Sequence, residues 1–316
     1  MTHAGWTLVT GGTGFVGSAV LARLKRDRIP ARGSVRDCAP SPGCFSAPAL
    51  EANTDWRPLL NGCGTIIHTA ARVHVMQDAA SDPLAAYREV NVHGTLQLAR
   101  QAVEIGVRRF VFLSSVKVNG ESTPAGQPFR ADDAPAPQDA YGASKAEAEA
   151  ALLQLAADTG LEVVIIRPPL VYGPGVKANF LRLMRCLRRG LPLPLGAVTR
   201  NRRSLVALDN LVDLIVTSTT HPAAANQVLL ASDGEDLSTT ALLRRLARAM
   251  GVPVHLLPVP VWALAAGGRL LGKTALVARL CDNLQVDSSG TCALLGWRPP
   301  ITVDEGLRRA ARAFRG

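Results

Sequence analysis

Short apolar runs alternate with longer segments of helical periodicity through the first half of the chain. Apolar runs bounded by turn residues predict strands, and apolar residues that recur every three or four positions predict helices. Strands that alternate with helices favour an α/β fold, a Rossmann-type doubly wound parallel sheet with its ligand beyond the carboxyl ends of the strands. The expected strands are 6–9, 31–35, 65–68, 109–114 and 161–167, and the expected helices are 14–27, 84–105 and 141–159.

The pattern changes after Arg167, where prolines and glycines separate shorter elements. Such residues interrupt regular structure, so we expect a smaller C-terminal lobe that binds substrate. The predicted division is a dinucleotide-binding Rossmann domain over 1–168 and a mainly substrate-binding lobe over 169–316. A helix at 209–219 and a strand at 226–230 could extend the main sheet, so segments near 205–231 should return to the Rossmann domain.

The most apolar late stretch runs from Val259 to Leu271. Gly267, Gly268 and Arg269 interrupt it, and it is too short to span a bilayer. We therefore expect a buried or groove-lining helix and no membrane insertion. The N-terminus passes directly into a strand without an apolar signal segment, which favours a cytoplasmic protein.

Composition narrows the classes of partner. The 316 residues are 47% apolar and 19% charged, as in globular proteins. The net charge is +10, but aromatic residues make up only 4%, too few for a surface that reads nucleic acid, so no nucleic acid is expected. Arginines gather between Arg182 and Arg203, where they either coat a helix or hold a phosphate-bearing small molecule. The six cysteines lack metal-ligand spacing, so no metal site is expected.

A glycine-rich turn follows the first expected strand and opens the first expected helix. Its sequence is Gly-Gly-Thr-Gly-Phe-Val-Gly, from Gly11 to Gly17. Gly11 permits a tight turn, Gly14 lets the backbone approach a pyrophosphate at the helix N-terminus, and Gly17 allows close packing of the helix on the strand. This context predicts a dinucleotide site, with an ordinary glycine turn as the alternative.

Tyr141 and Lys145 are spaced as Tyr-Gly-Ala-Ser-Lys. On a helix this spacing puts both side chains on one face, so the ammonium of Lys145 can favour ionisation of the Tyr141 phenol. Such a tyrosine can exchange a proton with an alcohol or sugar oxygen. A solvated pair with no role is the alternative, but the pair follows both the glycine turn and the pair Ser114-Ser115 at the end of an apolar run.

With these motifs in this order, the chain resembles the extended short-chain dehydrogenase/reductase family, and within it the NAD(P)-dependent sugar-nucleotide epimerases, dehydratases and 4-keto reductases. The resemblance covers nearly the whole chain. Besides the two motifs above, it rests on segments 66–71, 91–95, 114–120, 167–175 and 203–210.

The resemblance implies that Tyr141 is the catalytic acid/base, that Lys145 tunes it and contacts the nicotinamide ribose, and that Ser115 hydrogen-bonds the reacting oxygen. Ser115 rather than Ser114 stands five residues before Gly120, as in the family. Alternatively both serines cap a strand end, Asp55 is a helix N-cap, and Asn91 satisfies backbone groups. The implied cofactor contacts are Gly11, Gly14, Phe15, Val16, Gly17, Arg36, Asp55, Trp56, Thr69, Ala70, Ala71, Asn91, Tyr141, Lys145 and Pro168. The implied substrate contacts are Ser115, Val116, Tyr141, Asn179 and Arg203.

Two histidines lie near these motifs without a carboxylate cluster around them. His68 and His74 are therefore expected to be packed or polar-linking residues rather than metal ligands or general bases.

The end of the second strand departs from the family's epimerases, which hold an acidic residue there. Arg36 suits a 2′-phosphate, so NADP(H) is favoured, whereas Asp37 leaves NAD(H) open. A reductase fits NADPH better than an epimerase does. The resulting expectation is reduction of a UDP-4-keto-6-deoxy-N-acetylhexosamine in bacterial surface polysaccharide biosynthesis.

A UDP-hexose 4-epimerase with the same catalytic residues is the main alternative. A dehydratase lacks support, because Val116 and Lys117 replace the acidic pair that the family's dehydratases place there. A non-enzymatic NAD(P) sensor is a third reading, against which the intact Ser115, Tyr141 and Lys145 argue. The expected helices 84–105 and 141–159 carry extra apolar residues, and the family often pairs these helices, so a homodimer is expected.

Overall fold

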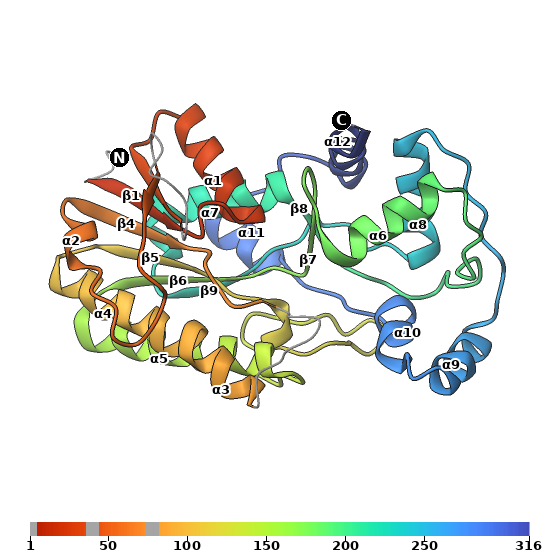
Figure 1. The fold of residues 1–316 in the computed structure, drawn as a ribbon, viewed down its shortest axis with the longest axis horizontal. Coiled ribbons are helices and arrows are strands. Elements are labelled where there is room, and N and C mark those ends of the chain that lie inside the picture. Colours follow the sequence, from red (N-terminus) through yellow and green to blue (C-terminus); the bar gives the residue numbers. More distant parts are fainter. Residues whose placement is uncertain (1–4, 36–43, 74–81, 316) are drawn as a thin grey trace.

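The computed structural model describes residues 5–35, 44–73 and 82–315. Within them, one seven-stranded sheet has the order β3-β2-β1-β4-β5-β6-β9, with every neighbouring pair parallel. The expected α/β fold with a Rossmann-like parallel sheet is thus confirmed (Figure 1). The strands are β1 (Trp6–Thr10), β2 (Ala31–Val35), β3 (Cys44–Ser46), β4 (Cys63–His68), β5 (Arg109–Leu113), β6 (Glu162–Arg167) and β9 (Gln227–Leu230).

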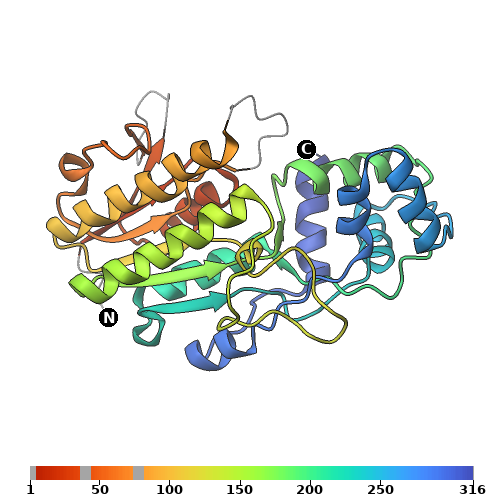
Figure 2. The ribbon, with the colours of Figure 1, turned by 90° about the horizontal axis from the view of Figure 1, so that it is seen from below.

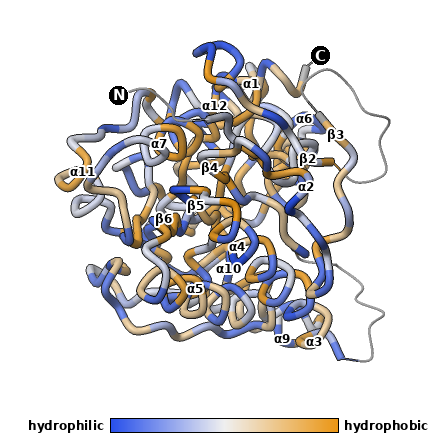
Figure 3. The backbone as a smooth tube through the Cα atoms, turned by 90° about the vertical axis from the view of Figure 1, so that its left-hand side faces the viewer, coloured by the Kyte–Doolittle hydropathy of each residue, from blue (hydrophilic) through white to orange (hydrophobic). Residues whose placement is uncertain are grey.

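Adjacent residues in the central strands point into two different cores. Ile66 faces one core and Ile67 the other, because successive side chains of a strand point to opposite faces. Figure 3 shows these strands as a largely hydrophobic centre between the helices. This two-sided burial explains why the strands read as continuous apolar runs.

Helices cover both faces of the sheet (Figures 1 and 2). One layer holds α3 (Pro83–Arg88), the π-helical turn η1 (Glu89–Gly94), α4 (Thr95–Glu104) and α5 (Ala140–Thr159). The opposite layer holds α1 (Phe15–Arg26), α7 (Leu208–Thr220) and α11 (Ser289–Leu295). Shorter pieces are α2 (Arg57–Leu60), η2 (Val116–Val118) and η3 (Pro222–Ala224).

The helix expected over 84–105 contains a π-helical turn where Gly94 passes close to another segment. A Cβ at Gly94 would lie 2.6 Å from the backbone of Leu50, so only glycine fits there. A π turn inserts one extra residue into a helical turn and often marks a functional position. Here it includes Asn91, whose side chain is almost completely buried.

The C-terminal half forms a second core beside the carboxyl ends of the strands. It contains the two-stranded parallel sheet of β7 (Leu170–Tyr172) and β8 (Leu205–Ala207), with α6 (Ala178–Arg188), α8 (Thr239–Met250) and α12 (Val303–Arg315) packed together. The chain also returns to the large sheet, since β9 pairs with β6 and α7 packs on it. What each half binds stays a prediction.

The apolar stretch 259–271 differs from its expectation. It forms α9 (Val261–Leu270), which is followed by α10 (Thr274–Cys281), but only Gly268 of α9 is buried. The expectation of a buried helix is wrong, because most large side chains of α9 are exposed, and the alternative of a groove-lining helix stays a prediction. No helix in the described ranges is both long enough and apolar enough to cross a bilayer.

Candidate functional site

The glycine turn joins β1 to α1 at the carboxyl end of the sheet. Gly11 has φ +68°, a left-handed conformation that suits glycine. A Cβ at Gly17 would lie 2.7 Å from Thr69 Oγ1 and closer still to the carbonyl oxygen of Gly11. Because the turn and the end of β4 pack this tightly, a side chain at Gly17 would push them apart.

The N-terminus of α1 has no side chain that satisfies its backbone donors. Gly14 is the N-cap without a side-chain hydrogen bond, and the first turn holds no acidic residue. Phe15 and Val16 lie in this turn and are partly buried. An uncapped helix N-terminus presents N–H groups and positive potential to an anion, so the turn fits the pyrophosphate of a dinucleotide.

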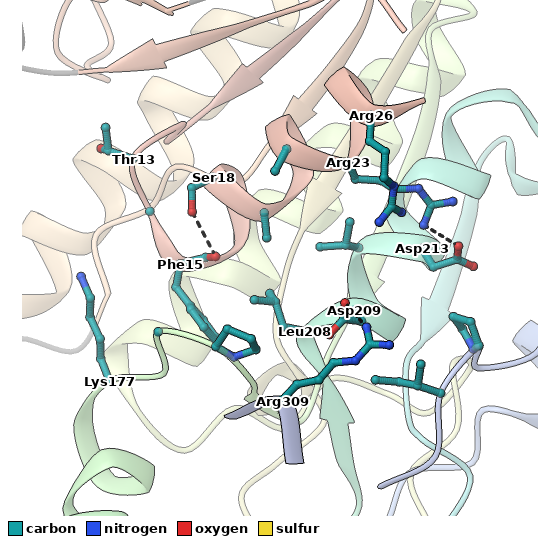
Figure 4. Close-up of a pocket in the computed structure, with 18 residues that line it drawn as sticks. Thr13, Phe15, Ser18, Arg23, Arg26, Lys177, Leu208, Asp209, Asp213 and Arg309 are labelled. Carbon is teal, nitrogen blue, oxygen red and sulfur yellow. Dashed lines mark hydrogen bonds and ion pairs between the residues drawn. The ribbon is translucent and has the colours of Figure 1, made fainter. Parts of the chain in front are cut away.

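A cavity of about 900 Å³ begins at this turn (Figure 4). Thr13 and Lys177 lie at one end of it, whereas Arg23, which pairs with Asp213 at 2.7 Å, lies at the other. The cavity therefore follows the outer side of α1, and Ser115, Tyr141 and Lys145 are not among its lining residues.

The segment after β4 is held against the turn and against α5. Thr69 Oγ1 donates to the carbonyl of Thr10 at 2.6 Å, and the Ala70 amide donates to Thr10 Oγ1 at 3.2 Å. Asn91 Oδ1 accepts from the Arg72 amide at 2.8 Å, and Asn91 Nδ2 donates to Ser144 Oγ at 3.0 Å. Asn91 thus ties the segment that contains Thr69, Ala70 and Ala71 to the helix that carries Tyr141.

His68 links two strands and a helix. Its ring nitrogens lie 2.9 Å from Thr10 Oγ1 and 3.1 Å from Thr95 Oγ1. Complete burial, and then the charge of Lys145, lower the pKa of His68 to about 3, so the ring is neutral. The prediction of a packed, polar-linking histidine is confirmed for His68, whereas His74 lies outside the described residues.

Lys145 lies on α5, and its side chain is buried. Its Nζ donates to the carbonyl of Leu113 at 2.9 Å, at the end of β5, and lies 4.3 Å from the centre of the Phe112 ring. Burial lowers the pKa of Lys145 to about 7 although Glu149 acts against the shift. The ammonium is therefore poised to change charge near neutral pH.

Tyr141 begins the same helix and is partly buried. Its ring lies edge-on to that of Tyr87, with 6.1 Å between centroids. Burial raises the pKa of the Tyr141 phenol, and the charges of Asp139 and Tyr87 raise it further. This shift runs opposite to the ionisation that the Tyr141 and Lys145 spacing suggests, because burial disfavours the charged phenolate.

Ser115 lies at the start of η2, opposite the first turn of α5. Its Oγ accepts from the Lys117 amide at 3.2 Å, so it does cap η2. Lys117 Nζ pairs with Asp139, and Asp139 accepts from the Gly142 amide at 2.7 Å as the N-cap of α5. The Lys117–Asp139 pair therefore fixes the segment of Ser115 against the helix turn that carries Tyr141.

A buried polar network beneath these residues was missed by sequence reasoning. Arg167 holds Glu149 through bonds of 3.0 and 2.5 Å, and its Nη1 donates to Asn119 Oδ1 at 3.1 Å. Ser114 donates to the same carboxylate. Glu149 stands one helical turn after Lys145. A carboxylate at this spacing from the lysine was the feature of the sequence from which a buried polar network could have been predicted. Ser114 thus has a role in this network, whereas Ser115 caps η2.

Four other residues that were predicted to contact the cofactor or the substrate differ in their burial. Asp55 is exposed and pairs with the Arg57 side chain at 2.8 Å. Its Oδ1 also accepts from the Arg57 amide at 3.2 Å, so it satisfies a backbone donor at the start of α2, although the N-cap residue is Trp56. The Trp56 side chain is 2% exposed within the core under α4. Its backbone is also engaged, since its amide donates to Gln101 Oε1 at 2.6 Å and its carbonyl accepts from the Leu59 amide at 2.9 Å. Val116 is buried against Leu230, Leu284 and Val286. Pro168 is buried beside η2 and accepts from the Val116 amide at 3.0 Å, and Arg36 lies outside the described residues.

The two predicted diphosphate contacts lie in the C-terminal half. Asn179 is exposed in the first turn of α6. Arg203 is half-buried, and its Nη1 donates to the carbonyl of Asp282 at 3.0 Å. Burial lowers the pKa of Arg203, and within the described residues no carboxylate forms an ion pair with it. A desolvated guanidinium with free donors is suited to an anion.

Comparison with known proteins places this site in a family. The model of the NAD dependent epimerase/dehydratase family matches residues 7–231. A Vibrio cholerae protein named UDP-glucose 4-epimerase is 51% identical over 311 residues, which cover 97% of this chain and 94% of the relative.

Solved structures agree on the fold. UDP-glucose 4-epimerase of Thermus thermophilus in complex with NAD is 23% identical, with a TM-score of 0.77 over 98% of this chain and 99% of that chain. UDP-glucose 4-epimerase of Thermotoga maritima with UDP-glucose is 21% identical, with a TM-score of 0.77 over 98% of both chains.

These comparisons overturn the expectation of a 4-keto reductase. The relative that is 51% identical over nearly the full length is named as a 4-epimerase, the alternative considered from the sequence. The error has a physical reason: the family resemblance implies the same serine, tyrosine and lysine for both reactions, so the choice depended on the arginines near the end of the second strand, Arg36 and Arg32. The chain belongs to the NAD dependent epimerase/dehydratase family.

Proposed function

We propose that the protein is a NAD-dependent UDP-hexose 4-epimerase, acting on UDP-glucose or its N-acetylated analogue. The observation that carries the proposal is the 51% identity to the Vibrio cholerae protein named UDP-glucose 4-epimerase, over nearly the whole of both chains. The positions of the three proposed catalytic residues support it, since Ser115 follows the carboxyl end of β5 and Tyr141 and Lys145 lie in the first two turns of α5.

Tyr141 is the proposed proton carrier at the 4-oxygen of the sugar. When bound, NAD supplies a hydride acceptor for sugar C4, a hydride donor for the return step and a positively charged ring. Because burial raises the pKa of Tyr141, its phenol needs nearby positive charge to give up its proton. Lys145, on the same face of α5, is the chain's own source of that charge.

Ser115 is the proposed hydrogen-bond donor to the same sugar oxygen. Its Oγ already accepts from the Lys117 amide, which orients the hydroxyl proton away from η2. Epimerisation requires the 4-keto sugar to turn over before the hydride returns to its other face. Ser115 and Tyr141 must keep their positions while the sugar turns, so that they can hydrogen-bond the 4-oxygen in both orientations of the sugar. The Lys117–Asp139 ion pair provides this constraint.

Arg203 and Asn179 are the proposed contacts to the diphosphate of the nucleotide sugar. Arg203 is the better supported, because its guanidinium is half-buried and is held by the Asp282 carbonyl rather than by a carboxylate. A diphosphate held away from the reacting carbon leaves the hexose free to turn while the nucleotide stays bound.

NAD rather than NADP is proposed as the cofactor. An epimerase returns its hydride to the same sugar, so the cofactor is not consumed and need not be the reduced form. We also keep a homodimer and a cytoplasmic location as proposals. The cofactor question is settled by extracting bound nucleotide from purified protein, and sedimentation at micromolar concentration tests the dimer.

The test of function is interconversion without net redox change. Purified protein mixed with UDP-glucose should form UDP-galactose until both are present at equilibrium, as followed by NMR of the anomeric protons, with no change in the absorbance of reduced nicotinamide. The Tyr141→Phe variant should lose nearly all turnover, whereas Tyr87→Phe, which alters the ring next to it, should keep most of it. Stoichiometric consumption of NADPH with a 4-keto sugar, and no epimerisation of any UDP-hexose, would refute the proposal.

A further inference from the structure

The α9–α10 hairpin exposes large apolar side chains at the end of the molecule. Trp262 is 74% exposed, Leu270 87% and Leu271 71%, far more than isolated surface apolar residues need to be. Together with Val261 and Leu276 they form what we name the α9–α10 patch. In Figures 1 and 2 the hairpin lies at the tip of the C-terminal half, away from the large sheet.

The patch is not needed to hold the hairpin together. The two helices meet on their other side at Gly268, where a Cβ would lie 2.6 Å from Val277 Cγ2. Leu264 and Leu280 pack against the core of the C-terminal half. Because inner residues make these contacts, the outer face is available for a partner.

Charge around the patch has one sign. Between Gly251 and Cys281 the sequence contains Arg269, Lys273 and Arg279 but neither aspartate nor glutamate. Arg269 and Lys273 are exposed beside Leu270 and Leu271, and neither has an ion-pair partner within the described ranges. Helical spacing places Trp262, Arg269 and Leu270 near one another on α9.

This combination matches the interface of an anionic bilayer. Tryptophan is favoured at the level of lipid headgroups, leucines enter the boundary of the acyl chains, and basic residues pair with anionic headgroups. A second copy of this chain fits less well, because both sides of a two-fold interface would carry the basic Arg269 and Lys273, and neither side would supply an acidic partner from the hairpin.

We propose that the α9–α10 patch docks the protein on the surface of a membrane that contains anionic lipid. The docking is peripheral, with the hairpin lying in the headgroup region. It goes beyond the proposed epimerase activity and does not depend on it. It would also bring the candidate diphosphate site near the bilayer, because α10 leads directly to Asp282, whose carbonyl holds Arg203.

The test is binding of the purified full chain to sedimented vesicles. Vesicles of phosphatidylcholine and phosphatidylglycerol in equal amounts should bind the protein, vesicles of phosphatidylcholine alone should bind it at least about tenfold less, and added salt should weaken binding. Trp262 emission should shift to shorter wavelength on binding. Of the other three tryptophans, Trp56 and Trp297 are buried and should change little. Trp6 is partly buried in β1, on the large sheet and away from the hairpin (Figure 1), so it should also change little.

Two double variants separate the apolar contribution to vesicle binding from the electrostatic contribution. Leu270→Ser with Leu271→Ser should lower vesicle affinity by about tenfold or more, and Arg269→Glu with Lys273→Glu should do the same while removing the preference for anionic lipid. Leu191→Ser is the matched control, because Leu191 is 45% exposed outside the patch. Circular dichroism and UDP-hexose epimerisation should be unchanged in all three.

Three outcomes would overturn the proposal. One is that wild-type protein does not bind the anionic vesicles. Another is that both patch variants bind as the wild type does. The third is that the leucine variant converts a dimer to a monomer in sedimentation, which would assign the patch to a second copy of the chain.

Discussion

The side-chain nitrogen Nζ of Lys145 lies 2.9 Å from the carbonyl oxygen of Leu113, so a buried hydrogen bond attaches α5 to the end of β5. Leu113 is followed at once by the serine pair, and Lys145 is on the same face of α5 as Tyr141. This hydrogen bond and the Lys117–Asp139 pair together hold the two parts of the proposed catalytic site against each other.

This buried lysine makes stability depend on pH in a defined direction. Burial lowers the pKa of Lys145 from 10.5 to about 7, so between these values the unfolded chain holds a proton that the folded chain has released. The unfolding free energy of cofactor-free wild type should therefore rise, relative to Lys145→Met, as pH goes from 7 toward 10. Urea unfolding of both proteins across this range measures it. A constant difference between them would show that the ammonium is not desolvated.

The buried pair of Glu149 and Arg167 should be costly to break on one side. Both side chains are about 5% exposed or less, and their closest contact is 2.5 Å. Glu149→Gln leaves the Arg167 charge uncompensated, and we expect a loss of about 3–5 kcal/mol of unfolding free energy. Glu149→Leu with Arg167→Met should cost less than the sum of the two single changes. If the loss of unfolding free energy in the double variant, measured by urea unfolding, equals the sum of the losses in the two single variants, the two residues are not coupled.

Gly142 is a position where one methyl group should impair the site. A Cβ there would lie 2.8 Å from the carbonyl oxygen of Lys117, so Gly142→Ala should force η2 away from α5 and separate Ser115 from Tyr141. We expect kcat for UDP-hexose epimerisation to fall by about tenfold to a hundredfold with a smaller change in KM. Gly267→Ala is the control, because nothing lies within 4 Å of its added Cβ. Equal activity of the two variants would contradict the expectation.

Sequence patterns predicted the fold better than they predicted the local chemistry. Strand-to-helix alternation placed Tyr141 and Ser115 on neighbouring elements, because periodicity reports which side of an element is buried. It could not show that Lys145 bonds to Leu113, since that contact depends on how α5 packs on β5. Nor could it show the burial of Glu149 and Arg167, whose residue types usually lie at the surface.

The same limit explains the wrong expectation for α9. Apolar composition indicated burial, but an apolar segment is buried only where another element covers it, and none of the described elements covers the outer side of Trp262 or Leu270. The choice between reductase and epimerase failed for a different reason. It rested on Arg36 and Arg32, while the family resemblance implies the same catalytic residues for both reactions.

Gly17 offers the sharpest test of the cofactor site. Its added Cβ would meet Thr69 Oγ1 at 2.7 Å and the Gly11 carbonyl even closer, so Gly17→Ala must shift the N-terminus of α1 from the end of β4. Because pyrophosphate binding depends on that N-terminus, the affinity for NAD should fall by about a hundredfold, as measured by calorimetry on cofactor-free protein. Ala19→Gly, two residues further along α1 at a partly exposed position, should lower stability by about 1 kcal/mol and leave NAD affinity unchanged. If the two variants bind NAD equally well, the cofactor does not rest on this turn.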